Sequence, residues 1–240
     1  VLMYMSTVVK IAGIYGLINV FGQVFRDSYF FWIDLISLLI VISMFYGYIT
    51  AWKQTNFRRL IAYSSIANAG LMLFALADIH NSNIFLFVGA YALATIALVV
   101  INLAVNDDSD ALENWEGIAW KNPMIGIALV IALFSLAGIP PMVGFYAKLS
   151  VLQALVASGH TADIALAVFA VFMSLIGAFY YLRVVKVMYF DEAVTATTVT
   201  AGADVRIVLS LNGLLILVLG IVPGALMSLC AQSVSQMLAN

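Results

Sequence analysis

Charged side chains are scarce in this sequence. Only 9% of its 240 residues are Asp, Glu, Lys or Arg, and 65% are hydrophobic, whereas a soluble domain carries about 25% charged residues. This composition excludes an ordinary soluble domain and predicts an all-α polytopic membrane protein whose surroundings are mostly lipid. We expect residues 1–240 to form a single membrane domain.

Residues that bind metals or nucleotides are also few. The sequence has one cysteine, Cys230, and two histidines, His80 and His160. This excludes an internal disulfide and a Cys-ligated iron–sulfur cluster held by this chain alone, and it argues against a zinc site. A phosphate-binding P-loop, a dinucleotide-binding glycine motif and the basic cluster that nucleic-acid binding requires are absent as well. We therefore expect no metal, no cofactor bound by this chain and no nucleic-acid partner.

Long apolar segments dominate what is present. A membrane-spanning helix needs about 20 mainly apolar residues, and polar stretches divide the chain into segments near 1–23, 29–52, 58–77, 83–105, 123–158, 163–190 and 206–229. The longest connection, 106–121, carries several acidic residues and is expected to be a solvated surface loop. Val1 already lies in an apolar run, with no charged region before it that would indicate a signal peptide. We expect that residues upstream are missing and that this is the C-terminal part of a longer protein.

The fifth segment, 123–158, is too long for one straight span and short for two. Pro140 and Pro141 in its middle lack backbone N–H groups and clash with the carbonyls four residues earlier, so Leu136 and Ala137 lose their helical partners. Backbone groups that lack helical hydrogen bonds are tolerated at membrane depth only where they are buried in protein or line a water-filled cavity. We therefore predict seven transmembrane segments, the fifth a discontinuous span of two half-helices around a break.

The distribution of basic residues supports this count. With a single crossing at 123–158, Arg26 falls on one side of the membrane and the other basic loop residues fall on the opposite side. The latter are Lys53, Arg58, Arg59, Lys121, Arg183, Lys186 and Arg206. Two crossings would remove the bias, so the positive-inside rule favours one. The start of the chain and the basic loops are then cytoplasmic (or the organellar equivalent), and the C-terminus is outward.

Two lysines lie inside apolar segments, where an ammonium costs about 2.5 kcal/mol or more and usually faces the bundle interior or a water-filled path. Lys148 follows the predicted break, and Tyr146 is the only other ionisable side chain of 123–158. Burial disfavours the charged form of lysine, and half-helix ends recur in the ion sites of transporters. Lys148 is therefore a candidate proton carrier, and Lys10 in VVKIAGIYG is a second. The alternative for both is a lysine that snorkels to the interface.

Ser64, Ser65 and Asn68 form a polar patch in the third segment. Ser64 and Asn68 are four residues apart and share one helix face. The patch could hold water in a proton path, or it could link helices by hydrogen bonds beside small residues. The sequence favours neither interpretation.

Other polar residues near segment ends are expected to have ordinary roles. The sixth segment closes with Tyr180, Tyr181, Arg183 and Lys186. Such an aromatic and basic ending predicts an anchor at the membrane interface. Asp34 suits the N-terminus of the second segment. We expect His80 and His160 at the surface, where either could sit at a proton entrance or exit.

Several stretches together resemble a known family. They are QTNFRRLIAYSSIANAG (54–70), SLAGIPPMVGFYAKLSVLQALV (135–156) and FYYLRVVKVMYF (179–190). They are similar to the C-terminal half of the N subunit of NADH:quinone oxidoreductase, respiratory complex I, and STVVKIAGIYGLINVF (6–21) resembles the eighth helix of that family. The resemblance covers nearly the whole chain. Related antiporter-like subunits share the motif around Pro140, whereas the Phe-Tyr-Tyr-Leu-Arg ending is typical of the N type.

The resemblance implies an antiporter-like, proton-translocating subunit that is driven by redox chemistry elsewhere in the complex. Lys10 matches the central lysine of the family, which links to the cytoplasmic half-channel. Lys148 matches the lysine of its broken helix, which links to the outward exit. Many members have a histidine where this chain has Asn68. An amide can hold water but does not titrate near neutral pH, so this position departs from the family's pattern.

By the same resemblance, the partners are other membrane-arm and peripheral-arm subunits of complex I and the lipid bilayer. NADH, FMN, iron–sulfur clusters and quinone are expected in those partner subunits. The bacterial plasma membrane is favoured over the mitochondrial inner membrane. Two alternatives stay open. One is a subunit of a cation/proton antiporter or membrane-bound hydrogenase built from the same module, and the other is a structural scaffold in which the lysines pair with carboxylates of neighbours.

Overall fold

The computed structural model describes residues 7–25, 29–74, 83–105, 111–192, 202–224, 226–230 and 232. Within these ranges every regular element is a helix, and an isolated β-bridge joins Asn56 to Ala111. The predictions for Val1, Arg26, His80 and the C-terminal residues 233–240 lie outside the described residues. The same is true of the acidic residues within 106–110.

The helices follow one another along the chain with short connections. They are α2 (Val8–Asn19), the π-helix η1 (Val20–Val24), α3 (Tyr29–Trp52), α4 (Phe57–Leu73), α5 (Asn83–Ala104), the 3₁₀ helix η4 (Leu112–Trp115), α6 (Ile118–Lys121), α7 (Pro123–Ala137), α8 (Val143–Ala157), α9 (Thr161–Phe190) and α10 (Ala203–Ile221). Among the described residues, four stretches are long and apolar enough to cross a membrane: Trp32–Trp52, Ile84–Ala104, Thr161–Phe190 and Ala203–Ile221. The prediction of an all-α integral membrane protein is therefore confirmed at this level.

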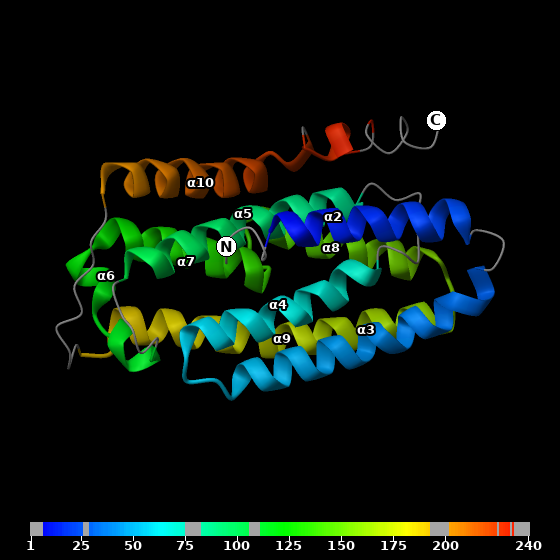
Figure 1. Ribbon diagram of the computed structural model, residues 1–240, viewed down its shortest axis with the longest axis horizontal. Coiled ribbons are helices and arrows are strands. Elements are labelled where there is room, and N and C mark those ends of the chain that lie inside the picture. Colours follow the sequence, from blue (N-terminus) through cyan, green and yellow to red (C-terminus); the bar gives the residue numbers. More distant parts are fainter. Residues whose placement is uncertain are drawn as a thin grey trace.

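The helices lie nearly side by side in layers (Figure 1). α3 packs against α4 and α9 on one side of the molecule, α5 packs against α7 and α8 in the middle, and α10 covers these middle helices from outside. Contacts of α9 with α7 and α8 join the layers. Large apolar side chains such as Leu38, Phe172 and Leu214 remain exposed on the outer helices. Apolar outer faces suit lipid, whose tails are as apolar as leucine.

The start of α4 and the end of α7 are fixed by local hydrogen bonds. The Asn56 side chain accepts from the backbone N–H of Arg59 at 3.0 Å, which satisfies one of the unpaired donors at a helix N-terminus. α7 ends at Gly138, whose φ of +80° lies in the left-handed region that glycine adopts readily. Gly138 N–H donates to Ser135 O at 3.1 Å and Ile139 N–H donates to Phe134 O at 2.9 Å. These bonds form a Schellman motif, which closes helix ends.

The turn 138–142 brings the beginning of α8 against the end of α7. The backbone N–H of Gly144 donates to Ser135 Oγ at 3.2 Å. A Cβ atom built on Gly144 would lie 1.9 Å from the carbonyl oxygen of Ser135, far inside van der Waals contact. The two helix ends can approach this closely only because residue 144 has no side chain.

The prediction of a solvated loop at 106–121 is wrong for its described part, 111–121. Residues 112–115 form η4 and residues 118–121 form α6. Trp115 is buried and stacks on Phe57 with ring centroids 4.1 Å apart, whereas Glu113 is exposed. The apolar residues of this segment alternate with its acidic ones, and burial of the apolar residues stabilises the fold. The prediction of a loop rested on the acidic residues alone.

Candidate functional site

Lys148 lies buried in the second turn of α8, with its side chain directed into the break. Its Nζ donates hydrogen bonds to Leu136 O at 2.6 Å and to Ala137 O at 3.2 Å. These are the two carbonyls that Pro140 and Pro141 deprive of helical partners. The side chain is only 8% exposed, so it does not snorkel to the surface of this chain. The break therefore supplies the polar contacts that a buried lysine needs.

Lys10 on α2 is held by oxygen atoms of two other helices. Its Nζ donates to the Tyr91 hydroxyl on α5 at 2.9 Å, to Ser65 O on α4 at 3.2 Å and to Ser65 Oγ. The Nζ also lies 4.9 Å from the centroid of the Tyr91 ring, within the range of a cation–π interaction. Lys10 is therefore anchored between α4 and α5 although it sits on a third helix.

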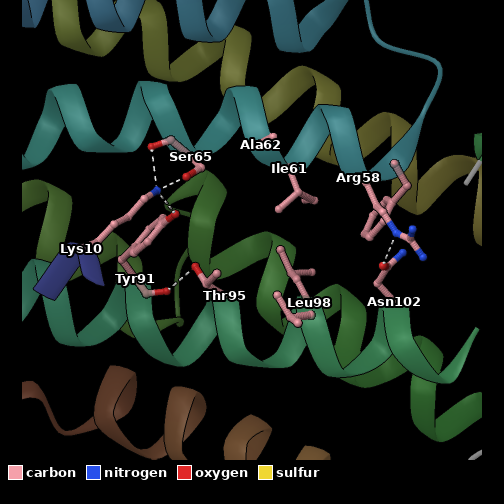
Figure 2. A pocket seen from close by; sticks show the side chains of 11 residues that line it. Lys10, Arg58, Ile61, Ala62, Ser65, Tyr91, Thr95, Leu98 and Asn102 are labelled. Atoms are coloured by element: carbon pink, nitrogen blue, oxygen red, sulfur yellow. Dashed lines mark hydrogen bonds between the residues drawn. The ribbon is translucent and has the colours of Figure 1, made fainter. Parts of the chain in front are cut away.

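A cavity of about 240 Å³ lies between α4 and α5, with Lys10 at one end (Figure 2). At the other end, Arg58 Nε donates to Asn102 Oδ1 at 2.9 Å. The remaining lining residues are Phe57, Ile61, Ala62, Ser65, Tyr91, Thr95, Leu98 and Val99. Liquid water occupies about 30 Å³ per molecule, so this cavity has room for several waters. Its walls are largely apolar, and the polar groups lie at intervals along it.

A second, much smaller cavity lies beside Lys148. Its volume is about 10 Å³, close to the minimum that holds one water molecule. Polar side chains of Asn68, Tyr91, Ser135 and Lys148 are among its lining residues. A water in it would have polar partners, as buried waters require.

The polar patch of α4 is divided between two faces of the helix. Ser65 contacts Lys10, whereas Ser64 and Asn68 are buried on the opposite side, where both contact the Tyr181 hydroxyl of α9. Asn68 Nδ2 also donates to Ser64 O at 2.9 Å, which confirms that the two residues share a face. Ser64 therefore links two helices. Asn68 does so too, and it also borders the small cavity.

The predicted interface anchor at the end of α9 is wrong for its two tyrosines. Tyr180 and Tyr181 are buried in the core, because they lie on the face of α9 that packs against its neighbouring helices. Arg183 donates to Trp52 O at 3.0 Å and to Gln54 O, and so holds the end of α3. Lys186 is exposed and pairs with Asp191 at 3.2 Å.

Removal of the Ser64 hydroxyl is expected to lower the free energy of unfolding by about 1 kcal/mol, the usual size of an interhelical hydrogen bond in membrane proteins. Ser64→Ala removes the bond between α4 and α9 without touching Lys10. Thermal denaturation of the purified complex measures the effect. Ser43→Ala, at a partly exposed serine on α3, is the matched control. Equal stability of the two variants would contradict a linking role for Ser64.

The remaining candidates lie away from this region. Asp34 is exposed near the start of α3, and His160 is exposed directly before α9. No group of three His, Cys, Asp or Glu residues that could hold a metal ion occurs in the part of the chain that the structure describes. Tyr91 and Thr95, four residues apart in the mainly apolar helix α5, were not predicted from the sequence. That spacing on one helix face was the available signal.

The sequence and the helix arrangement of this chain have counterparts in known proteins. Residues 1–177 match the family described as "NADH:quinone oxidoreductase/Mrp antiporter, TM". The chain belongs to this family. The resemblance to subunit N that the sequence motifs predicted is also confirmed, because relatives of that name match most of the chain.

One such relative is NADH-quinone oxidoreductase subunit N from Polaromonas naphthalenivorans, which is 43% identical over 220 residues, or 85% of this chain and 44% of that protein. Respiratory complex I from Thermus thermophilus with bound aureothin contains a chain with TM-score 0.75 and 30% identity, covering 81% of this chain and 45% of that one. The Mrp complex from Dietzia sp. gives TM-score 0.78 with 18% identity over 94% of this chain and 51% of that one, which shows a shared fold alone. This member of the family thus spans about half the length of the relatives it matches.

Proposed function

We propose that this chain is part of a proton-translocating membrane subunit of an NADH:quinone oxidoreductase, and that Lys10 and Lys148 carry the protons. The observation that carries the proposal is this pair of lysines. Each Nζ is held by oxygen atoms inside an apolar helical bundle, and each lysine borders a cavity. Ionisable side chains in such positions mark ion and proton pathways. The relatives named as subunit N of this oxidoreductase support the same function.

In the proposed path, protons reach Lys10 through the large cavity, pass water near Ser64, Ser65 and Asn68, and leave through Lys148. Redox chemistry in other subunits drives these transfers. Moving one charge against 100 mV takes about 2.3 kcal/mol. A lysine whose proton affinity changes by one or two pKa units supplies about 1.4 kcal/mol for each unit, which is the scale required. This chain itself contributes the path and no redox site.

The proposed topology has seven crossings within one membrane domain, 1–240. α7 and α8 contain 15 residues each, so each is about 22 Å long at 1.5 Å per residue. The hydrocarbon core is about 30 Å thick, which neither helix spans alone. We therefore propose that α7 and α8 form one discontinuous crossing. The positive-inside rule then makes the loop at Lys53 and Arg58 cytoplasmic and the C-terminus outward.

The proposed partners are the other membrane-arm and peripheral-arm subunits of complex I. Those subunits would bind NADH, FMN, the iron–sulfur clusters and quinone. The proposed location is a bacterial plasma membrane, which the bacterial origin of the relatives supports.

Variants of Lys10 in the complete subunit test the proposed function. Lys10→Met removes the titratable group, and Lys10→Arg keeps a positive charge and several donors but cannot release a proton. Both are expected to lower the rate of proton pumping about tenfold or more, the size of effect typical for the loss of a positioned proton-transfer group. The measurement is acidification of proteoliposomes that contain the assembled complex, with NADH as the reductant.

The alternatives predict different results from the same variants. A structural scaffold needs only the positive charge, so Lys10→Arg would then assemble and pump like the unmodified complex. An antiporter subunit would exchange sodium for protons without NADH, and it would not copurify with quinone-reducing subunits. A membrane-bound hydrogenase would copurify with its own redox subunits in their place.

A further inference from the structure

Tyr91 lies where the two cavities meet. It lines both the large cavity that contains Lys10 and the small cavity that contains Lys148. Its side chain is 6% exposed, and it comes from α5, which packs against α8, the helix that carries Lys148. Of the residues that line these two cavities, Tyr91 is the one that they share. A hydrogen-bonded path between the two cavities can therefore run through the Tyr91 hydroxyl.

The contacts of Lys10 determine where the Tyr91 hydroxyl proton can point. A lysine ammonium has three N–H donors and no acceptor. Its N–H groups meet the Tyr91 hydroxyl oxygen, Ser65 O and Ser65 Oγ (Figure 2). While the Tyr91 oxygen accepts from the ammonium, its own single proton must be directed elsewhere. The small cavity, which Tyr91 also lines, has room for one water that would accept this proton.

We infer that the Tyr91 hydroxyl transfers protons between Lys10 and Lys148 through this water, an inference that rests on the proposed function. In the transfer, one N–H bond of the Lys10 ammonium breaks and the proton binds the Tyr91 oxygen. The original Tyr91 O–H bond breaks, and its proton passes to the water. A proton of the water then binds the lone pair of neutral Lys148. Lys10 ends neutral, Lys148 ends as an ammonium, and Tyr91 and the water keep their composition.

The geometry also supplies a step that resets the relay. After the transfer, the proton on Tyr91 is the one received from Lys10, and it points at the neutral amine. When Lys10 gains a new proton from the large cavity, its N–H groups again need the Tyr91 oxygen as an acceptor. The tyrosine O–H must then rotate toward the small cavity. Recharging of Lys10 thus prepares Tyr91 for the next proton.

Tyr91→Phe in the complete, assembled complex tests the inference. The variant keeps the ring beneath Lys10 and removes only the hydroxyl. We expect pumping to slow about tenfold or more. Tyr46→Phe, at a tyrosine on α3 that is 54% exposed, is the matched control and should pump normally.

A second variant separates proton transfer from a structural effect. Tyr91→His keeps an aromatic ring with one donor and one acceptor, and it is expected to recover part of the pumping that Tyr91→Phe loses. Equal loss in the His and Phe variants, at equal assembly, would overturn the inference. Normal pumping by Tyr91→Phe, with Lys148→Met inactive, would also overturn it while leaving the proposed function intact. Normal pumping by Lys148→Met would count against the proposed function itself.

Discussion

Replacement of Lys148 by methionine in the complete subunit is expected to stop proton pumping while the complex still assembles. Methionine is a flexible apolar side chain that fills irregular core space, so the buried position of Lys148 on α8 can accept it. The change removes the titratable amine and leaves Leu136 O and Ala137 O without the donor that they now have. An unpaired buried acceptor costs about 1–3 kcal/mol, which a large assembled complex can tolerate.

The measurement compares NADH-driven acidification of proteoliposomes with the amount of assembled complex in the same preparation. Lys53→Met is the matched control, because Lys53 is exposed directly after α3 and borders neither cavity. It should pump like the unmodified complex. Undiminished pumping by Lys148→Met would contradict the role of Lys148 as a proton carrier. If Lys148→Met instead prevents assembly of the complex, the result would favour the structural scaffold.

The surroundings of Lys148 could be predicted because they depend on local chain chemistry. Two adjacent prolines remove specific helical hydrogen bonds, and the affected carbonyls are known from the spacing alone. A lysine eight residues after the first proline, in an apolar segment, has few other polar groups to contact. The structure confirms this pairing, in which Lys148 donates to both freed carbonyls. The wide apolar outer faces of α3, α9 and α10 also follow from composition.

The partners of Lys10 could not be predicted in this way, because they come from distant parts of the chain. Tyr91 is 81 residues from Lys10, and nothing local relates the two. The same limit explains the error for Tyr181. An aromatic residue near a basic helix end is often an interface anchor, but here the rotation of α9 turns Tyr181 toward α4 and Ser64. Whether such an aromatic side chain faces the interface or the core depends on how whole helices pack, which cannot be derived from the local sequence.

Alanine in place of Gly144 or Gly220 is expected to be the most destabilising small change in the chain. A Cβ at Gly144 would lie 1.9 Å from Ser135 O, and one at Gly220 on α10 would lie 2.0 Å from Pro141 O. Both clashes are with backbone atoms of the end of α7 and the turn that follows it, which cannot move aside as a side chain can. Overpacking in a core costs about 1–3 kcal/mol and occasionally more, and we expect each variant to reach or exceed the upper value.

Gly89→Ala on α5 is the matched control, because a Cβ there would meet nothing within 4 Å. Alanine stabilises an exposed helix position by up to about 1 kcal/mol relative to glycine, so this variant should be neutral or slightly more stable. Thermal unfolding of the purified complex distinguishes the two groups of variants. Since Gly144 and Gly220 hold α8 and α10 against the break, their alanine variants should also displace Lys148 from Leu136 O and reduce pumping in the fraction that stays folded. Normal stability and pumping of Gly144→Ala would contradict the close approach of Gly144 on α8 to Ser135 O on α7.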